Sequence, residues 1–144
     1  MPNPLDRDLD QVLSHTGGVW KQLAGAEIFL TGGTGFFGCW MLETLLWANG
    51  RLDLGVSATV LTRRPDAFAR KAPHLVADAA VRLIEGDVRS FAFPDRGCSH
   101  VLHLAADTDA RRYDEDPIGM LDTIIAGTRH LYSYVYTFLS ADSS

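Results

Sequence analysis

The residues best suited to chemistry in this chain are the glycines of one short run, Ile28-Phe-Leu-Thr-Gly-Gly-Thr-Gly-Phe-Phe-Gly38. Gly33, Gly35 and Gly38 have the spacing G-x-G-x-x-G, and Gly32, Gly35 and Gly38 have the spacing G-x-x-G-x-x-G. Glycine lets a backbone turn tightly and approach phosphate oxygens, and the free N–H groups at the start of a following helix favour their negative charge. The run therefore predicts a cradle for the pyrophosphate of a dinucleotide. The alternative is a tight turn between two packed elements.

Such a cradle needs a strand before the glycines and a helix after them, and the hydrophobic pattern predicts both. Residues 26–31 read as a buried strand, and residues 36–48 carry apolar side chains at helical spacing, ending at Asn49-Gly50. Further strands are expected at residues 57–62, 81–84 and 99–104, and further helices at 65–72 and from Pro117 onward. Strands that alternate with helices imply parallel β-α-β units. The predicted fold class is therefore α/β, with a doubly wound parallel sheet that ends after about four strands.

An amphipathic segment precedes this alternation. Apolar side chains recur at helical spacing from Leu5 to Leu13, and Gly17-Gly18 is expected to end the helix. The predicted organisation is an N-terminal helical extension, residues 1–25, followed by a dinucleotide-binding domain, residues 26–144.

Composition narrows the class of protein. The 144 residues are 47% hydrophobic and 22% charged, which suits one compact globular unit. A net charge of −5 without any basic cluster argues against nucleic acid as a partner. Cys39 and Cys98 are too few for a disulfide framework or a zinc site, and no metal site is predicted; Cys39 is expected to be a buried thiol that acts as a small hydrophobe. No signal segment opens the chain and no apolar stretch is long enough for a membrane span, so we expect a cytoplasmic protein without a membrane partner.

Three motifs stand at the ends of expected strands: Thr31-Gly-Gly-Thr-Gly-Phe-Phe-Gly38, Gly86-Asp87-Val88 and His103-Leu-Ala-Ala106. Together they resemble the cofactor motifs of the extended short-chain dehydrogenases/reductases, and within that superfamily most closely those of the nucleotide-sugar epimerase/dehydratase group. Each follows an expected strand, at the edge of the sheet where ligands bind in open α/β folds. The resemblance runs from about Glu27 to Thr128. It implies a Rossmann-type fold, an NAD(P) cofactor and hydride transfer to or from a nucleotide-sugar substrate.

The resemblance also implies a role for each motif. The loop that would hold the pyrophosphate comprises Gly32, Gly33, Thr34, Gly35, Phe36, Phe37 and Gly38. Asp87 and Val88 would flank the adenine, with the carboxylate accepting from the exocyclic amine; the alternative is an ordinary turn residue at Asp87. Leu104, Ala105 and Ala106 would form the floor beneath the riboses. His103 is expected to pack behind that floor without taking part in catalysis.

The end of the second expected strand bears on the choice between NAD and NADP. NAD sites typically have a carboxylate there that accepts from the ribose 2′-hydroxyl. This strand ends Thr62-Arg63-Arg64-Pro65, without a carboxylate, and two guanidinium groups can hold a 2′-phosphate. Asp53 has a suitable count from the glycines but falls in the loop before the strand. NADP is therefore favoured over NAD, and solvated surface arginines are the alternative.

The catalytic Tyr-xxx-Lys pair that the resemblance implies is missing. The chain has two lysines, Lys21 and Lys71, and neither follows Tyr132 or Tyr136 by four residues. A phenol with an ordinary pKa near 10 needs a nearby cation to act as an acid or base near neutrality, so no catalytic residue is assigned. Two functions stay open. One is the cofactor-binding part of an epimerase/dehydratase, and the other is a catalytically silent dinucleotide-binding or regulatory module.

The carboxyl end departs from the pattern of the superfamily. Residues 129–144 are too few to complete a helix, a turn and a fifth strand, so we expect an N-terminal fragment, a premature stop or a frame-shifted product of a longer enzyme. Ser143 and Ser144 are expected to belong to a frayed terminus. Residues 107–113 are expected to form a loop that faces the substrate, in which Arg111 or Arg112 either pairs with a diphosphate or stays solvated. A homodimer is one option for the assembly.

Overall fold

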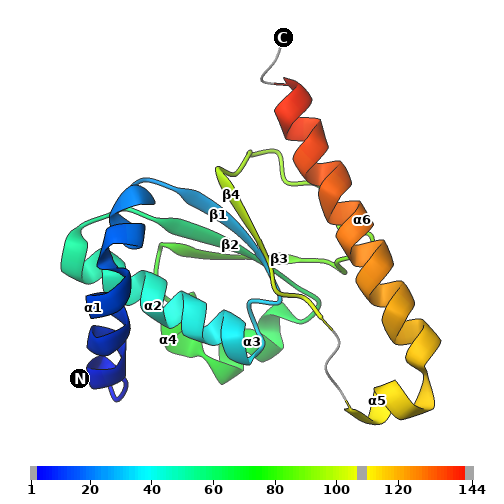
Figure 1. Cartoon of the computed structure of the whole chain (residues 1–144), viewed down its shortest axis with the longest axis horizontal. Helices are drawn as coiled ribbons and strands as arrows, with labels where there is room; N and C mark the ends of the chain where they lie inside the picture. The colour runs from blue at the N-terminus through cyan, green and yellow to red at the C-terminus, as the bar shows by residue number, and fades with distance from the viewer. Residues whose placement is uncertain (1–2, 107–109, 142–144) are drawn as a thin grey trace.

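A four-stranded parallel sheet organises the chain. The computed structural model describes residues 3–106 and 110–141. The strands are β1 (Glu27–Thr31), β2 (Ser57–Thr62), β3 (Val81–Glu85) and β4 (His100–His103), in the order β3-β2-β1-β4 (Figure 1). The helices are α1 (Asp6–Gln22), α2 (Phe36–Leu52), α3 (Pro65–Lys71), α4 (Pro73–Val76), α5 (Ala110–Glu115) and α6 (Pro117–Ala141). The α/β fold class with a parallel, Rossmann-type sheet is thus confirmed.

Helices cover both faces of this sheet because alternate residues of each strand point to opposite sides. Ile28, Leu30 and Val60 face the larger core, which α1, α2, α3 and α4 complete. Phe29 and Leu61 face the other side, where they pack with side chains of α6. Figure 1 shows α6 on the opposite side of the sheet from α2. The register pairs Phe29 of β1 with Thr59 of β2 and Val101 of β4. Strand β1 contributes apolar side chains to both cores.

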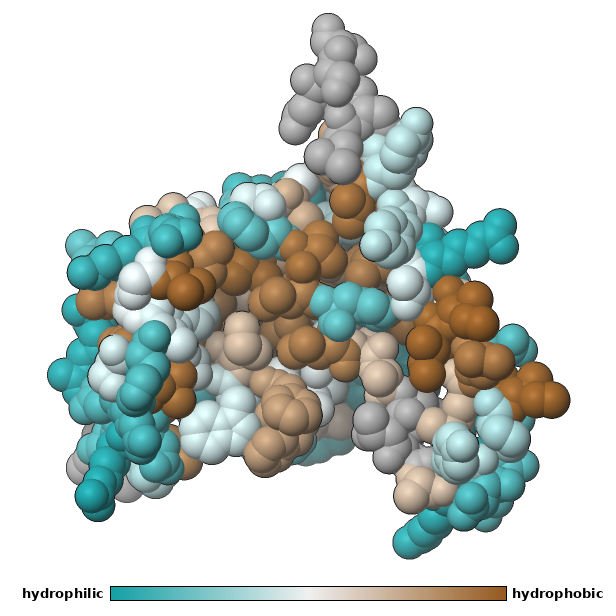
Figure 2. Space-filling model, viewed as in Figure 1, coloured by the Kyte–Doolittle hydropathy of each residue, from teal (hydrophilic) through white to brown (hydrophobic). Residues whose placement is uncertain are grey.

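The long helix α6 is apolar on more than one side. Leu131 and Tyr134 are buried against the sheet and the β3–β4 crossover, and Met120 is also buried. Several other large apolar side chains on this helix are exposed, namely Ile118, Leu121, Ile124, Ile125, Tyr132 and Tyr136. Figure 2 shows apolar surface gathered over the part of α6 nearest α5. Within the described part of the chain, no helix is long and apolar enough to cross a bilayer.

The elements expected from the sequence are found, with differences at their ends. Each strand lies within one residue of its expected bounds, and α6 begins at Pro117 as predicted. Residues 110–113 lie in helix α5, so the prediction of a loop there was wrong. Residues 107–109 of that expected loop, together with Ser143 and Ser144, lie outside the described residues.

The predicted end of the first helix was also wrong. Helix α1 continues through Gly17 and Gly18 to Gln22, because its last turn carries Trp20 into the larger core. The backbone turns instead at Gly25, whose φ of 72° is a conformation that glycine adopts without strain. Trp20 therefore packs the N-terminal helix against the domain, and the division of the chain at residue 25 stays a prediction.

Helix α2 likewise runs past its predicted end. Asn49 does not stop the helix, since its side chain accepts from the N–H of Val56 at 3.0 Å and donates to the Val56 carbonyl at 2.7 Å. The helix ends at Leu52, and Asp53 follows with a left-handed φ of 52°. These two hydrogen bonds hold the loop that leads into β2. Asp53 lies in that loop, as the sequence predicted, and not at the far end of β2.

Candidate functional site

The four segments expected to bind a cofactor meet at one edge of the sheet. The glycine loop follows β1, Thr62–Arg64 ends β2, Asp87 and Val88 follow β3, and residues 104–106 follow β4. All four strands are parallel, so their carboxyl ends lie together (Figure 1). The topology alone therefore brings together residues that are up to 74 positions apart, such as Thr31 and Ala105.

The first and last glycines of the loop are required by the protein's own packing. Gly32 has a φ of +72°, and a Cβ on it would lie 2.4 Å from the carbonyl carbon of Leu104. A Cβ on Gly38 would lie 2.3 Å from the carbonyl oxygen of Gly32. Real Cβ atoms do not come so close to backbone, so these two glycines let the loop sit between the end of β4 and the first turn of α2.

Gly35 is different, because the fold itself does not need a glycine there. Its φ is −79°, and the nearest atom to an added Cβ is the Gly32 carbonyl oxygen at 3.4 Å. The space beside Gly35 is therefore open toward solvent. A glycine that is free of internal contacts, at the start of a helix, fits the close approach of a phosphate-bearing ligand to the backbone.

The start of α2 presents unbonded donors beside that space. Cys39 makes the first hydrogen bond of the helix, from its N–H to the Gly35 carbonyl at 2.9 Å, and none of the described side chains caps the helix. The N–H groups of Phe36, Phe37 and Gly38 precede that bond and have no partner within the helix. The rings of Phe36 and Phe37 are 72% and 74% exposed and meet edge to face. This helix end is therefore open to an anion.

Lys71 holds the glycine loop from outside. Its Nζ donates to the Thr34 carbonyl at 3.0 Å, and Cys39 Sγ donates weakly to the same oxygen at 3.8 Å. Burial raises the pKa of Cys39, so this half-buried side chain stays a neutral thiol. The contact of Lys71 was not predicted, because it depends on how α3 lies beside the loop and no sequence periodicity links the two.

His103 joins three elements behind the loop. Its Nδ1 hydrogen-bonds Thr31 Oγ1 at 2.6 Å, and its Nε2 hydrogen-bonds Thr128 Oγ1 at 3.1 Å. Thr31 is fully buried, and its hydroxyl also accepts from the N–H of Ala105 at 3.3 Å. Burial lowers the pKa of His103, which favours the neutral imidazole. The ring ties β1 and β4 to α6, and its place behind a cofactor floor formed by Leu104–Ala106 stays a prediction.

A hollow of about 350 Å³ lies at the end of β2. Thr62 is buried and its hydroxyl accepts from the N–H of Arg64 at 3.2 Å, which shapes this strand end. Besides the predicted Arg63 and Arg64, the hollow is lined by Pro65, Asp66, Ala67, Arg70 and Glu85. Sequence reasoning missed the third arginine and both carboxylates, because they are brought in by α3 and by the neighbouring strand β3.

Asp87 is held mainly by Arg89, two residues further along the chain. Its carboxylate accepts three hydrogen bonds from Arg89: from the backbone N–H at 2.8 Å, from Nε at 2.9 Å and from Nη2 at 2.9 Å. These side-chain hydrogen bonds, opposed by some burial, lower the pKa of Asp87 to about 2. The turn expected as the alternative is present. Since a carboxylate offers about four lone pairs, one on Oδ2 is still available to an outside donor.

The remaining predicted residues line the same edge. Val88 packs against α6, where a Cβ on Gly127 would lie 2.8 Å from Val88 Cγ1. Leu104 is 38% exposed, Ala105 is half-buried and Ala106 is exposed, so this segment forms an accessible apolar strip beside the glycine loop. Among the described residues, no group of three His, Cys, Asp or Glu side chains is arranged to hold a metal ion.

A parallel sheet with a glycine loop and an open helix start after its first strand defines a Rossmann-type nucleotide-binding fold. The chain belongs to the NAD dependent epimerase/dehydratase family, whose model matches residues 28–141. The resemblance found in the sequence is thereby confirmed at the level of the family.

Solved structures with a similar fold include the following two. A UDP-glucose 4-epimerase matches with a TM-score of 0.60 and 21% identity, over 78% of this chain and 32% of that one. Pen from Bacillus thuringiensis matches with a TM-score of 0.64 and 19% identity, over 78% of this chain and 34% of that one. This chain therefore spans about a third of the length of either structure. No curated protein sequence matches it significantly.

The contrast between two glycines predicts different effects on stability. Gly38→Ala places a methyl group against the Gly32 carbonyl and should lower the free energy of unfolding by about 3 kcal/mol. Gly35→Ala meets no such contact and should cost less than about 1 kcal/mol. Urea unfolding followed by circular dichroism measures both. Equal destabilisation by the two variants would contradict the assignment of Gly35 to an outside contact.

The Asp87–Arg89 pair predicts a dependence of stability on acid. The pKa of Asp87 is lowered in the folded chain from its ordinary value of 3.8, so its contribution is complete above about pH 4 and is lost as the pH falls toward 2. Arg89→Gln should return the Asp87 pKa toward 3.8 and flatten the stability profile in that window. Carbon-13 NMR of the Asp87 carboxyl measures the pKa. Arg7→Gln, on the exposed side of α1, is the control and should leave it unchanged.

Proposed function

We propose that this chain binds NADP(H) at the carboxyl edge of its sheet, as the cofactor-binding part of an epimerase or dehydratase that acts on a nucleotide sugar by hydride transfer. The observation that carries the proposal is the contrast within the glycine loop. At Gly32 and Gly38, the protein's own backbone occupies the space where a Cβ would lie. At Gly35 that space is open, next to the start of α2. A pyrophosphate would occupy that space, with the amides of Phe36 and Phe37 as donors.

The hollow at the end of β2 supports NADP rather than NAD. Its three guanidinium groups, from Arg63, Arg64 and Arg70, outnumber the carboxylates of Asp66 and Glu85. A 2′-phosphate would be held by planar guanidinium forks in this net positive hollow. Glu85 is the opposing feature, because a carboxylate here would accept from a free 2′-hydroxyl and repel a phosphate. The charge balance favours the phosphate.

The remaining residues would orient the adenosine and the nicotinamide half. Asp87 would accept from the adenine amine through the open lone pair on Oδ2, with Val88 beside it. The segment Leu104–Ala106 would lie beneath the riboses, held at its position by Thr31 and His103. The bound nicotinamide would supply hydride transfer, and these residues would position it against the sheet edge.

A catalytically silent dinucleotide-binding module is the second candidate, and one observation favours it. None of the tyrosines in the chain has a lysine four residues later, so no phenol here has the partner that would activate it. Turnover of a UDP-, GDP- or dTDP-sugar by the purified chain, followed by product NMR, would support the enzyme. Binding of NADPH without any turnover would support the module.

The arginine hollow gives the test of cofactor preference. NADPH should bind more tightly than NADH, and the Arg63→Gln/Arg64→Gln double variant should weaken NADPH binding about tenfold to hundredfold, because a charge-assisted hydrogen bond contributes about 1.5–3 kcal/mol. NADH binding should change little. Titration by cofactor fluorescence measures both affinities, and Arg7→Gln is the matched control.

Gly35→Ala completes this test, because the variant is expected to fold. It should weaken NADPH and NADH alike, since both share the pyrophosphate. Equal affinities of the unchanged chain for the two cofactors would contradict the NADP preference. Binding that is unaffected by Gly35→Ala would contradict the placement of the pyrophosphate.

A further inference from the structure

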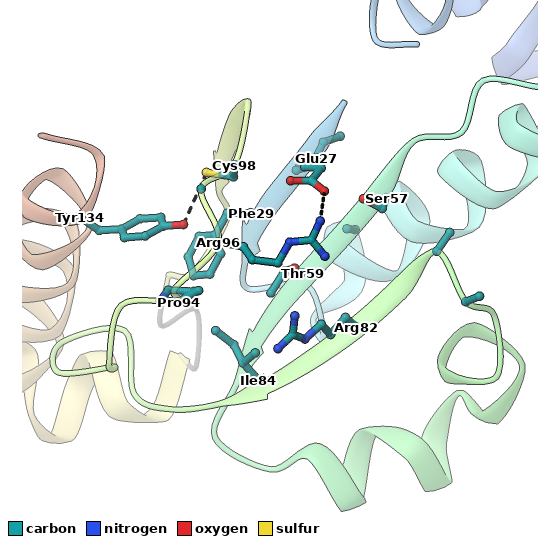
Figure 3. Close-up of a pocket in the computed structure, with 15 residues that line it drawn as sticks. Glu27, Phe29, Ser57, Thr59, Arg82, Ile84, Pro94, Arg96, Cys98 and Tyr134 are labelled. Carbon is teal, nitrogen blue, oxygen red and sulfur yellow. Dashed lines mark hydrogen bonds and ion pairs between the residues drawn. The ribbon is translucent and has the colours of Figure 1, made fainter. Parts of the chain in front are cut away.

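A second pocket lies at the opposite, amino edge of the sheet. It has a volume of about 160 Å³ and lies between the face of β1, β2 and β3 and the crossover that follows β3 (Figure 3). We propose that this pocket binds a small carboxylate ligand with a short apolar body, held by Arg82 and Arg96. This inference does not rest on the function proposed above.

The pocket exists because the β3–β4 crossover contains no helix. Phe91 and Phe93 of the crossover pack into the smaller core beneath α6, and the chain then continues through Pro94 to Cys98 at the amino edge. Tyr134 of α6 reaches Cys98 Sγ with its hydroxyl at 3.6 Å and closes one side. In the described part of the chain, the part of the sheet face that carries Thr59 and Arg82 therefore lies beside the crossover loop, with Tyr134 at one side.

Two guanidinium groups face this hollow. Figure 3 shows Arg82 from β3 and Arg96 from the crossover pointing into it, with Glu27 of β1 beside Arg96. The backbone of Arg82 belongs to the ladder between β2 and β3, and its guanidinium group makes no hydrogen bond or ion pair with any described residue. Arg96 makes a single contact with Glu27 at 3.3 Å, and the two side chains are 75% and 47% exposed. A pair so exposed is weak, so Arg96 can turn toward a ligand at little cost.

The balance of charge and surface selects the class of ligand. Two arginines against one glutamate leave one net positive charge, which a monoanion neutralises. A guanidinium fork matches the two oxygens of a carboxylate, and the hydroxyls of Ser57 and Thr59 lie on the neighbouring strand as further donors. Phe29, Ile84 and Pro94 supply an apolar wall. The volume corresponds to about five water molecules, so the ligand must be small.

The pocket is separate from the glycine loop. Glu27 begins β1 and lines the pocket, whereas Thr31 ends β1 and leads into the loop. At about 3.3 Å per residue, the two ends of the strand are about 13 Å apart. A carboxylate at the amino edge would therefore bind without displacing a nucleotide from the carboxyl edge.

Benzoate is the probe that tests this proposal. Titration into nitrogen-15-labelled chain should give saturable shifts of the Arg82 Nε and Thr59 amide resonances, with a dissociation constant in the millimolar range. Arg82→Gln should weaken binding at least tenfold, and Arg7→Gln should leave it unchanged. Glu27→Gln should tighten binding severalfold, because it releases Arg96. Thermal unfolding of each variant establishes that it is folded.

Four outcomes of the benzoate titration would overturn the proposal, and a fifth comes from competition with NADPH. They are the absence of saturable shifts at these resonances, binding that survives Arg82→Gln, equal binding of the neutral isostere benzamide, and preference for inorganic phosphate over benzoate. Displacement of benzoate by NADPH would also contradict it, since the ligand would then occupy the nucleotide site. Failure of NADPH to bind the chain would leave this pocket unaffected and would bear only on the function proposed above.

Discussion

The close contact between Gly32 and the backbone of Leu104 is the constraint on which the carboxyl edge of this sheet depends. A positive φ at Gly32 turns the chain out of β1, and the absence of a Cβ lets the turn pass directly against the end of β4. Gly38 then lets the first turn of α2 rest on that same loop. The direction of α2, and with it the orientation of its free N–H groups, follows from these two contacts between backbones.

Hydrogen bonds keep that geometry in place from both layers of the fold. On one side, Lys71 of α3 donates to the Thr34 carbonyl at 3.0 Å. On the other, the neutral imidazole of His103 links the buried hydroxyl of Thr31 to α6 through Thr128. The loop is thus supported by helices on opposite faces of the sheet. A change in the packing of either helix would reach the loop through a single side chain.

Local signals in the sequence were enough for the fold and for the position of the glycine loop between β1 and α2. Strand positions follow from short apolar runs, and the glycine spacing carries its own steric reason. Contacts that depend on how the elements pack could not be predicted from the sequence. The positions of Lys71, Arg70 and Arg82 depend on where α3 and β3 lie, which no periodicity in the sequence indicates. The predicted helix end at Gly17-Gly18 was wrong because burial of Trp20, further along the same helix, keeps both glycines helical. Asp87 shows both effects: a turn residue was the predicted alternative at this position, whereas its hydrogen bonds with the Arg89 side chain were not predicted.

The two edges of the sheet differ because the crossover and α6 divide its second face unequally. Aromatic packing of Phe29, Phe91 and Tyr134 fills the middle of that face and leaves polar residues at both ends. At the carboxyl edge these polar groups are ordered by hydrogen bonds, whereas at the amino edge the guanidinium group of Arg82 has no hydrogen-bond or ion-pair partner among the described residues. An apolar centre with a charged group at its rim costs the fold little stability, because an exposed guanidinium group stays hydrated. The smaller core therefore stabilises the sheet and also shapes the wall of the second pocket.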